Sequence, residues 1–173
     1  VSGSAAGEYL VSLGLPRERI FRQYGCVDNE FFREQADDCS RATSPRYFVV
    51  SCRLIEARKN LKRLLAAFQS YREAAGPNAW ELVICGDGED REDIVGFARQ
   101  SAVEGVRFVG FQQYADLARY YGEASCFVHP AVNEAWGLVV NEAMAAGLPV
   151  LVSRRCGCAW DLVHEGVNGW TFD

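Results

Sequence analysis

Short apolar runs alternate with amphipathic segments along most of this chain of 173 residues. The apolar runs predict strands buried on both faces, and they occupy residues 46–51, 80–85, 106–111, 126–129 and 150–153. Between strands the apolar positions take helical spacing, as in Leu61, Leu64, Leu65 and Phe68. Strands that alternate with helical crossovers form a parallel sheet. The pattern therefore predicts an α/β fold with helices on both faces of the sheet.

Glycines, capping residues and breakers set the limits of the other elements. The crossover helices are predicted at residues 61–76, 89–102, 114–123 and 137–147. Smaller elements are predicted as a helix at 2–14, an extended piece at 19–21, a turn with one or two helical turns at 25–32, a surface loop at 37–45, a short helix at 158–165 and a turn at 168–169.

The composition is that of a globular protein, with 49% hydrophobic and 24% charged residues. A net charge of −5 argues against a nucleic-acid surface or a basic membrane-binding patch. No apolar run approaches the ~20 residues of a membrane span, and residues 1–15 lack the basic region of a signal peptide. We therefore expect a cytoplasmic domain that contacts neither nucleic acid nor membrane, within a protein that could be peripheral at the inner face of a membrane.

Seven cysteines are scattered along the chain, most of them in strand-like settings. An odd number without regular spacing predicts reduced, buried thiols rather than a disulfide framework. Cys156-Gly157-Cys158 has no matching second pair, so a zinc site is not expected.

Two carboxylates flank the start of the helix predicted at 137–147. Glu134 lies in the preceding loop and Glu142 lies about a turn and a half inside the helix. Side chains of a helix lean toward its N-terminus, where free N–H groups and the helix dipole favour an anion. One carboxylate beside the helix start and one behind it indicate a ligand site.

The segment that holds these carboxylates resembles a known family. Glu134-AWGLVVN-Glu142, followed by AMAAGLPV, is similar to the E-x7-E signature of retaining glycosyltransferases of family 4, which have the two-domain GT-B architecture. Further motifs match in order: G-x-V-D before Phe31-Phe32, R-L-x-x-x-x-K-N from Arg53 to Asn60, and G-x-G from Gly86 to Gly88. The resemblance implies that the chain is the C-terminal half of a GT-B enzyme, a Rossmann-like domain that binds the sugar donor.

The resemblance also implies a role for each position. The family moves a sugar from a nucleoside diphosphate to an acceptor hydroxyl and keeps the anomeric configuration. Glu134, Arg53 and Lys59 are expected to be catalytic, with Glu134 near the donor sugar and the two cations on the diphosphate. Glu142 is expected to bind the ribose, and the other donor-binding residues to be Gly86, Gly88, Gly110, Phe111, Trp136, Gly137, Leu138 and Val139. His129, at a strand end, is more typical of a structural residue.

No metal or cofactor is expected. The acidic residues Asp87, Glu89 and Asp90 follow a strand, but the chain has no D-x-D motif and the GT-B class does not need a metal. Acidic residues at the start of a helix are favoured by its dipole, and this explains them equally well.

The resemblance divides the chain at residue 25. Residues 1–24 are expected to form an interdomain connection, and residues 25–173 a nucleotide-sugar-binding domain that lacks its C-terminal end. The expected partners are a UDP- or GDP-sugar donor and an acceptor sugar, lipid or polysaccharide, which an absent N-terminal domain would bind. Without that domain the chain is expected to be inactive in transfer. The alternatives are a nucleotide-sugar-binding module, or half of a GT-B-like epimerase or phosphorylase.

Overall fold

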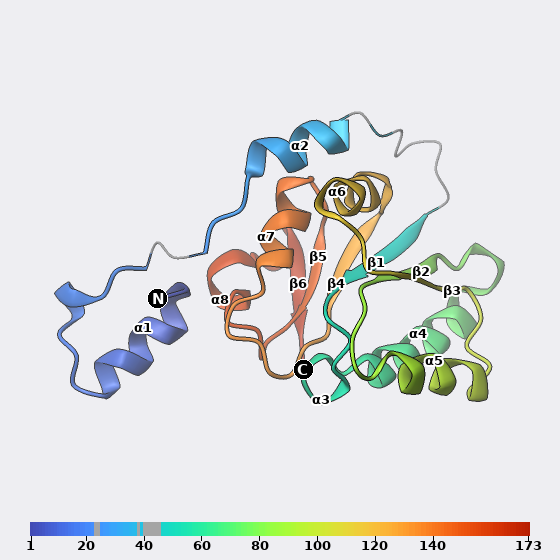
Figure 1. Cartoon of the computed structure of the whole chain (residues 1–173), viewed down its shortest axis with the longest axis horizontal. Helices are drawn as coiled ribbons and strands as arrows, with labels where there is room; N and C mark the ends of the chain where they lie inside the picture. The colour runs from blue at the N-terminus through green and yellow to red at the C-terminus, as the bar shows by residue number, and fades with distance from the viewer. Residues whose placement is uncertain (23–24, 38, 40–45) are drawn as a thin grey trace.

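A computed structural model describes residues 1–22, 25–37, 39 and 46–173. Its centre is a parallel sheet of six strands in the order β3-β2-β1-β4-β5-β6 (Figure 1). The strands are β1 (Tyr47–Ser51), β2 (Glu81–Cys85), β3 (Val106–Gly110), β4 (Cys126–His129), β5 (Val150–Ser153) and β6 (Gly169–Phe172). The first five confirm the apolar runs. The sixth was missed, because Trp170 and Thr171 give no apolar run of strand length.

Helices cover both faces of this sheet, as the sequence predicts. Alternate residues of a strand point to opposite faces, so Val49 and Val83 join one core cluster while Val50 and Ile84 join the other. The helices that pack on the first cluster are α2 (Asn29–Asp37), α6 (Tyr114–Glu123), α7 (Leu138–Ala145) and α8 (Ala159–Leu162). Those that pack on the second are α4 (Leu61–Ala75) and α5 (Arg91–Gln100). The fold is therefore Rossmann-like.

Several predicted bounds are corrected. The extended piece predicted at 19–21 begins inside a 3-10 helix, η1 (Arg17–Arg19), and the helix predicted at 158–165 has only the four residues of α8. A short helix that was not predicted, α3 (Glu56–Lys59), precedes α4, and a 3-10 turn, η2 (Gly76–Asn78), follows it. Most of the loop predicted at 37–45 lies outside the described residues.

The N-terminal segment extends away from the sheet (Figure 1). Helix α1 (Gly3–Ser12) contacts the sheet domain at α8. The backbone N–H of Ser4 donates to the Asp161 carboxylate at 2.8 Å, so an acidic side chain satisfies the start of α1. Gly3 is required here, because its φ is +77° and an added Cβ would lie 2.2 Å from the Trp136 ring.

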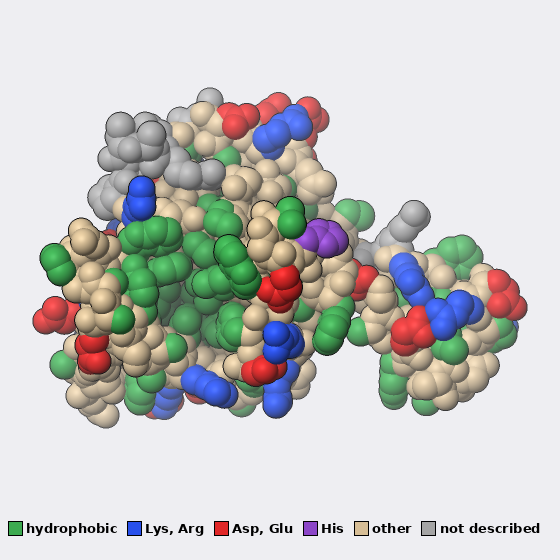
Figure 2. Space-filling view, turned by 180° about the vertical axis from the view of Figure 1, so that it is seen from behind, with side chains coloured by type: hydrophobic (Ala, Val, Ile, Leu, Met, Phe, Trp, Pro, Cys, Tyr) green, Lys and Arg blue, Asp and Glu red, His purple; other side chains and the backbone are tan. Residues whose placement is uncertain are grey.

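Hydrophobic side chains gather over a broad, hollowed area on the back of the molecule, as Figure 2 shows. Large apolar residues are exposed near the C-terminus as well, among them Trp160, Val167 and Trp170. Within the described ranges, no helix has the length and apolarity needed to cross a membrane.

Candidate functional site

Two adjoining pockets open at the carboxyl ends of the strands, where ligands bind in sheets of this kind. Their volumes, about 350 and 360 Å³, fall in the range of small-molecule sites. Both are lined by Ser51, Cys52, Arg53 and Val139. The first, here called the β2-side pocket, also has Cys85, Gly86, Asp87, Phe111, Gln112 and Leu117; the second, the α7-side pocket, also has Ser2, Gly25, Lys59, Glu134, Ala135, Trp136, Gly137 and Leu138.

A buried ion pair lies in the α7-side pocket. Lys59, only 8% exposed, donates from its Nζ to Oε2 of Glu134, which comes from the loop after β4. Lys59 reaches this position because it ends the short helix α3, after which Asn60 takes a left-handed conformation and α4 begins. The Glu134 carboxyl faces His129 and Lys59, and its pKa is lowered to about 2. The structure therefore brings together two of the three predicted catalytic residues.

His129 lies behind this ion pair. Its side chain is 1% exposed, and neither ring nitrogen has a hydrogen-bond partner among the described residues. Its Nε2 is 3.8 Å from Oε2 of Glu134, which is too long for a hydrogen bond. Burial lowers the pKa of the imidazole. A buried polar group without a partner is uncommon and requires an explanation.

The backbone that carries Glu134 is held by the Cys156-Gly157-Cys158 segment. The N–H of Gly157 donates to the Glu134 carbonyl at 3.0 Å, and the N–H of Cys158 donates to the Trp136 carbonyl at 3.2 Å. Both cysteine thiols are free and buried, and burial raises each thiol pKa to about 12. This segment therefore has a structural role toward the site, which sequence spacing alone did not reveal.

Replacing Gly157 by alanine is expected to destabilise the chain by about 1–3 kcal/mol, because an overpacked contact must be relieved by a backbone shift. The added Cβ would lie 2.0 Å from the Ala135 carbonyl oxygen. Gly96, inside α5, is the matched control: a Cβ there meets nothing within 4 Å, so Gly96→Ala should stabilise by about 0.5–1 kcal/mol. Urea unfolding of both variants measures the contrast. A neutral Gly157→Ala would mean that the loop moves freely.

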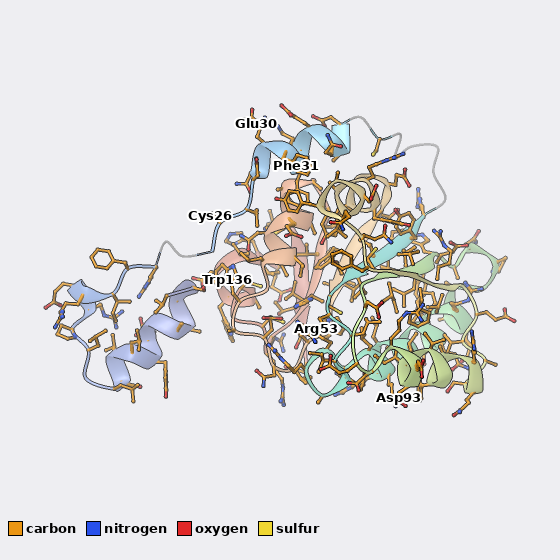
Figure 3. All side chains as sticks on the ribbon, viewed as in Figure 1. Cys26, Glu30, Phe31, Arg53, Asp93 and Trp136 are labelled. Atoms are coloured by element: carbon orange, nitrogen blue, oxygen red, sulfur yellow. The ribbon has the colours of Figure 1, made fainter. Side chains whose placement is uncertain are left out.

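Arg53 lies apart from the ion pair. Its side chain is 71% exposed and donates to Glu89 at 3.2 Å, although the residue lines both pockets. Figure 3 labels Arg53 beside the strands and Trp136 toward the N-terminal segment. Exposed ion pairs contribute little free energy, so Arg53 can leave Glu89 for a ligand.

The glycine motif after β2 packs tightly against the segment that follows β1. A Cβ on Gly86 would lie 1.9 Å from the Cys52 carbonyl oxygen, and one on Gly88 2.5 Å from that of Leu54. The N–H of Gly86 donates to the Gly110 carbonyl at 2.7 Å. Gly86 also lines the β2-side pocket, whereas Phe111, 68% exposed, offers that pocket an aromatic surface. These glycines therefore let two strand ends approach closely at the rim of the site.

Glu142 contacts helix α6 and takes no part in the ion pair. Its Oε2 accepts a hydrogen bond from the Tyr121 hydroxyl of α6 at 3.1 Å, and the residue is not among those that line either pocket. Burial raises the pKa of Glu142. The structure thus places only Glu134, of the two glutamates in the E-x7-E pattern, in the lining of these pockets.

The N-terminus of α7 faces the α7-side pocket. Gly137 precedes the helix with φ +100°, a left-handed conformation that favours glycine, and Leu138 and Val139 open the helix beside the pocket. The first N–H groups of a helix have no partner within it and attract anions. Trp136 donates from its indole nitrogen to Asn141 at 2.9 Å, which fixes the ring at the pocket rim.

The acidic residues that follow β2 form hydrogen bonds and an ion pair with neighbouring segments. Asp90 accepts the backbone N–H of Glu56 at 2.8 Å and makes no side-chain cap on α5, while Glu89 pairs with Arg53. In the part of the chain that the structure describes, no group of three or more His, Cys, Asp or Glu residues is placed to hold a metal ion.

A family model, "Glycosyl transferases group 1", matches residues 32–173. The chain belongs to this family. It is 30% identical to the sulfoquinovosyl transferase SQD2 of Arabidopsis thaliana over 99% of this chain and 33% of SQD2. It is 32% identical to a GDP-mannose-dependent alpha-mannosyltransferase of Mycobacterium tuberculosis, over 89% of this chain and 38% of that protein.

A solved structure confirms the GT-B-type fold of this group 1 domain. Anabaena HepE, crystallised in complex with UDP, superposes with a TM-score of 0.80 at 20% identity, over 99% of this chain and 48% of HepE. The group 1 domain therefore spans a third to a half of the length of these proteins.

Sequence reasoning on this group 1 domain missed three features of the site. It did not foresee the direct Lys59–Glu134 pair, the backbone support from Gly157, or the position of His129 behind Glu134. For the backbone support, the available signal in the sequence was Gly157 between two cysteines, since a glycine in a short loop often marks a close backbone approach.

Proposed function

We propose that this domain binds the nucleoside diphosphate of a sugar donor and serves a retaining transfer of a hexose to an acceptor hydroxyl. The observation that carries this proposal is the α7-side pocket, in which the buried ammonium of Lys59 lies near the free N–H groups at the start of α7. A pocket lined by a cation and by the N-terminus of a helix favours binding of a diphosphate, because both groups attract anions. UDP- and GDP-sugars are the candidate donors.

In the proposed complex, Lys59 and Arg53 hold the diphosphate and neutralise charge as it leaves the sugar. Arg53 turns from Glu89 to do so, and Leu138 and Val139 supply backbone N–H groups. Glu134, in the same pocket as Lys59, lies where the donor sugar would enter and orients its hydroxyls. Phe111 offers a face to the base, and Glu142 accepts the ribose hydroxyls. The proposal requires no metal or other cofactor.

The acceptor half of the reaction lies outside this chain in our proposal. The domain spans only a third to two fifths of its curated relatives, and both reactants must be positioned together for transfer. We therefore propose that a further domain binds the acceptor sugar, lipid or polysaccharide, and that the isolated chain binds donor without transferring it. The UDP complex of HepE supports a nucleotide ligand for the same fold.

Thermal unfolding with UDP, GDP, ADP and CMP tests this function. A nucleoside diphosphate at about 100 times its dissociation constant should stabilise the chain by about 2.7 kcal/mol. CMP should stabilise less than the best diphosphate, because it lacks the second phosphate that Lys59 and Arg53 would bind. If no diphosphate at millimolar concentration raises the melting temperature, the proposal fails.

A further inference from the structure

We propose that His129 is a reserve partner for Glu134, which takes up a hydrogen bond to the carboxylate when a donor diphosphate draws Lys59 away. This inference rests on the proposed function. His129 would thereby keep Glu134 facing the donor sugar during the reaction, as a positioning residue that does not touch the substrate.

The first support is the environment of His129. The imidazole is 1% exposed and has no hydrogen bond from either nitrogen among the described residues. Buried side-chain polar groups mostly have partners, because leaving one unpaired costs free energy. A partner that arrives only in another state of the site would explain why a histidine, rather than an apolar residue, ends strand β4.

The second support is the direction of its Nε2. This atom is 3.8 Å from Oε2 of Glu134, the same oxygen that Lys59 holds. A Cβ built on Gly137 would lie 3.4 Å from Nε2 and 3.4 Å from Cγ of Glu134, so glycine leaves the space between them open. A carboxylate movement of under about 1 Å would bring the pair within hydrogen-bond range.

The third support is the competition for Lys59. A diphosphate in the α7-side pocket would attract the ammonium and leave Glu134 as a mostly buried carboxylate without its cation. A buried charge without a partner is strongly unfavourable. His129 is the remaining polar side chain beside that oxygen in the contacts given above, and a neutral imidazole can donate from Nε2.

Among the residues that the structure describes, few other charges surround the imidazole. Lys59 on α3 and Glu134 after β4 are the charged groups that act on it, with opposite effects on its pKa. Beside β4, the Cys158 thiol lies near Gly137, the Cys156 thiol donates to the Ala131 carbonyl, and burial keeps both protonated. The Phe127 ring stacks at 6.0 Å. Removing Lys59 should therefore couple His129 to Glu134.

A ligand-free test follows the imidazole proton signals by NMR during a pH titration. The chain has two histidines, and His164, which is exposed, is assigned with His164→Gln. In Lys59→Met the pKa of His129 should rise by about one pH unit or more, since an opposite charge nearby favours the imidazolium. The rise should disappear in Lys59→Met/Glu134→Gln. No rise, or an equal rise in both variants, would overturn the proposal.

A second test compares the diphosphate with the nucleotide sugar, using UDP with UDP-glucose and GDP with GDP-mannose. His129→Leu should lose about tenfold in affinity for both the diphosphate and the nucleotide sugar, because Lys59 leaves Glu134 in both complexes, while His129→Gln, which keeps a donor near Nε2, should retain most of the affinity. His164→Leu is the control. If His129→Leu binds the nucleotide sugar as tightly as the wild-type protein does, this inference alone is overturned. If the wild-type protein binds neither diphosphate, the proposed function is overturned and this inference with it.

Discussion

Replacing Glu134 by glutamine is expected to lower the free energy of unfolding by up to about 3 kcal/mol at neutral pH. In the site that Glu134 shares with His129 and Lys59, the pKa of its carboxyl is lowered from the ordinary 4.5 to about 2. A carboxyl whose pKa is lower in the folded state stabilises the fold at pH values above its pKa in the unfolded chain. This stabilisation is lost as the pH falls through the pKa of the folded state. The difference between wild type and Glu134→Gln should therefore be full above about pH 4.5 and vanish near pH 2.

The same substitution is expected to tighten diphosphate binding several-fold. In wild type the diphosphate must compete with Glu134 for Lys59 and approach a carboxylate, whereas glutamine removes both obstacles. Denaturation at several pH values and calorimetric titration with UDP and GDP measure the two effects. Asp161→Asn, at a part-buried carboxylate that binds Ser4 on α1, is the control and should leave affinity unchanged. Weaker diphosphate binding by Glu134→Gln would mean that Lys59 does not leave Glu134.

Replacing Arg53 by alanine is expected to weaken diphosphate binding about ten- to hundredfold and to leave the weaker binding of the bare nucleoside almost unchanged. The exposed pair with Glu89 offers little competition for this guanidinium. Glu142→Ala should lower the affinity for the diphosphate and for the nucleoside by a similar factor, because both ligands carry the ribose. Arg63→Ala, on the exposed side of α4, is the matched control and should change neither affinity.

The pattern across ligands decides this prediction, rather than the size of any one loss. Equal losses for nucleoside and diphosphate in Arg53→Ala would assign Arg53 to the base pocket or to the fold. Unchanged affinities in Glu142→Ala would assign Glu142 to the hydrogen bond with Tyr121 alone.

The sheet could be predicted from the sequence because its first five strands are continuous apolar runs joined by helices, and these patterns follow from burial on both faces. The position of the site followed from the same topology, since motifs after parallel strands meet at one edge. The order of strands and the sixth strand required the structure, because Gly169–Phe172 pairs with β5 through backbone groups that no side-chain pattern marks.

Contacts within the site were less predictable. Lys59 meets Glu134 across 75 positions of sequence, and only because an unpredicted helical turn, α3, directs its side chain into the pocket. The role of Gly157 depends on a backbone approach between two loops, and that of His129 on the space left by Gly137. Such contacts are set by packing between distant segments, whereas periodicity records only which face of an element is buried.

Titration of the wild-type chain with UDP and GDP, followed through its backbone amide NMR signals, tests the central claim most directly. We predict saturable binding of at least one diphosphate, with the largest changes at Leu138 and Val139 and in the segment 52–53, around the α7-side pocket. Absence of saturable binding at millimolar concentration would contradict the account. So would changes centred on the separate polar pocket lined by Tyr47, Arg107 and Arg119.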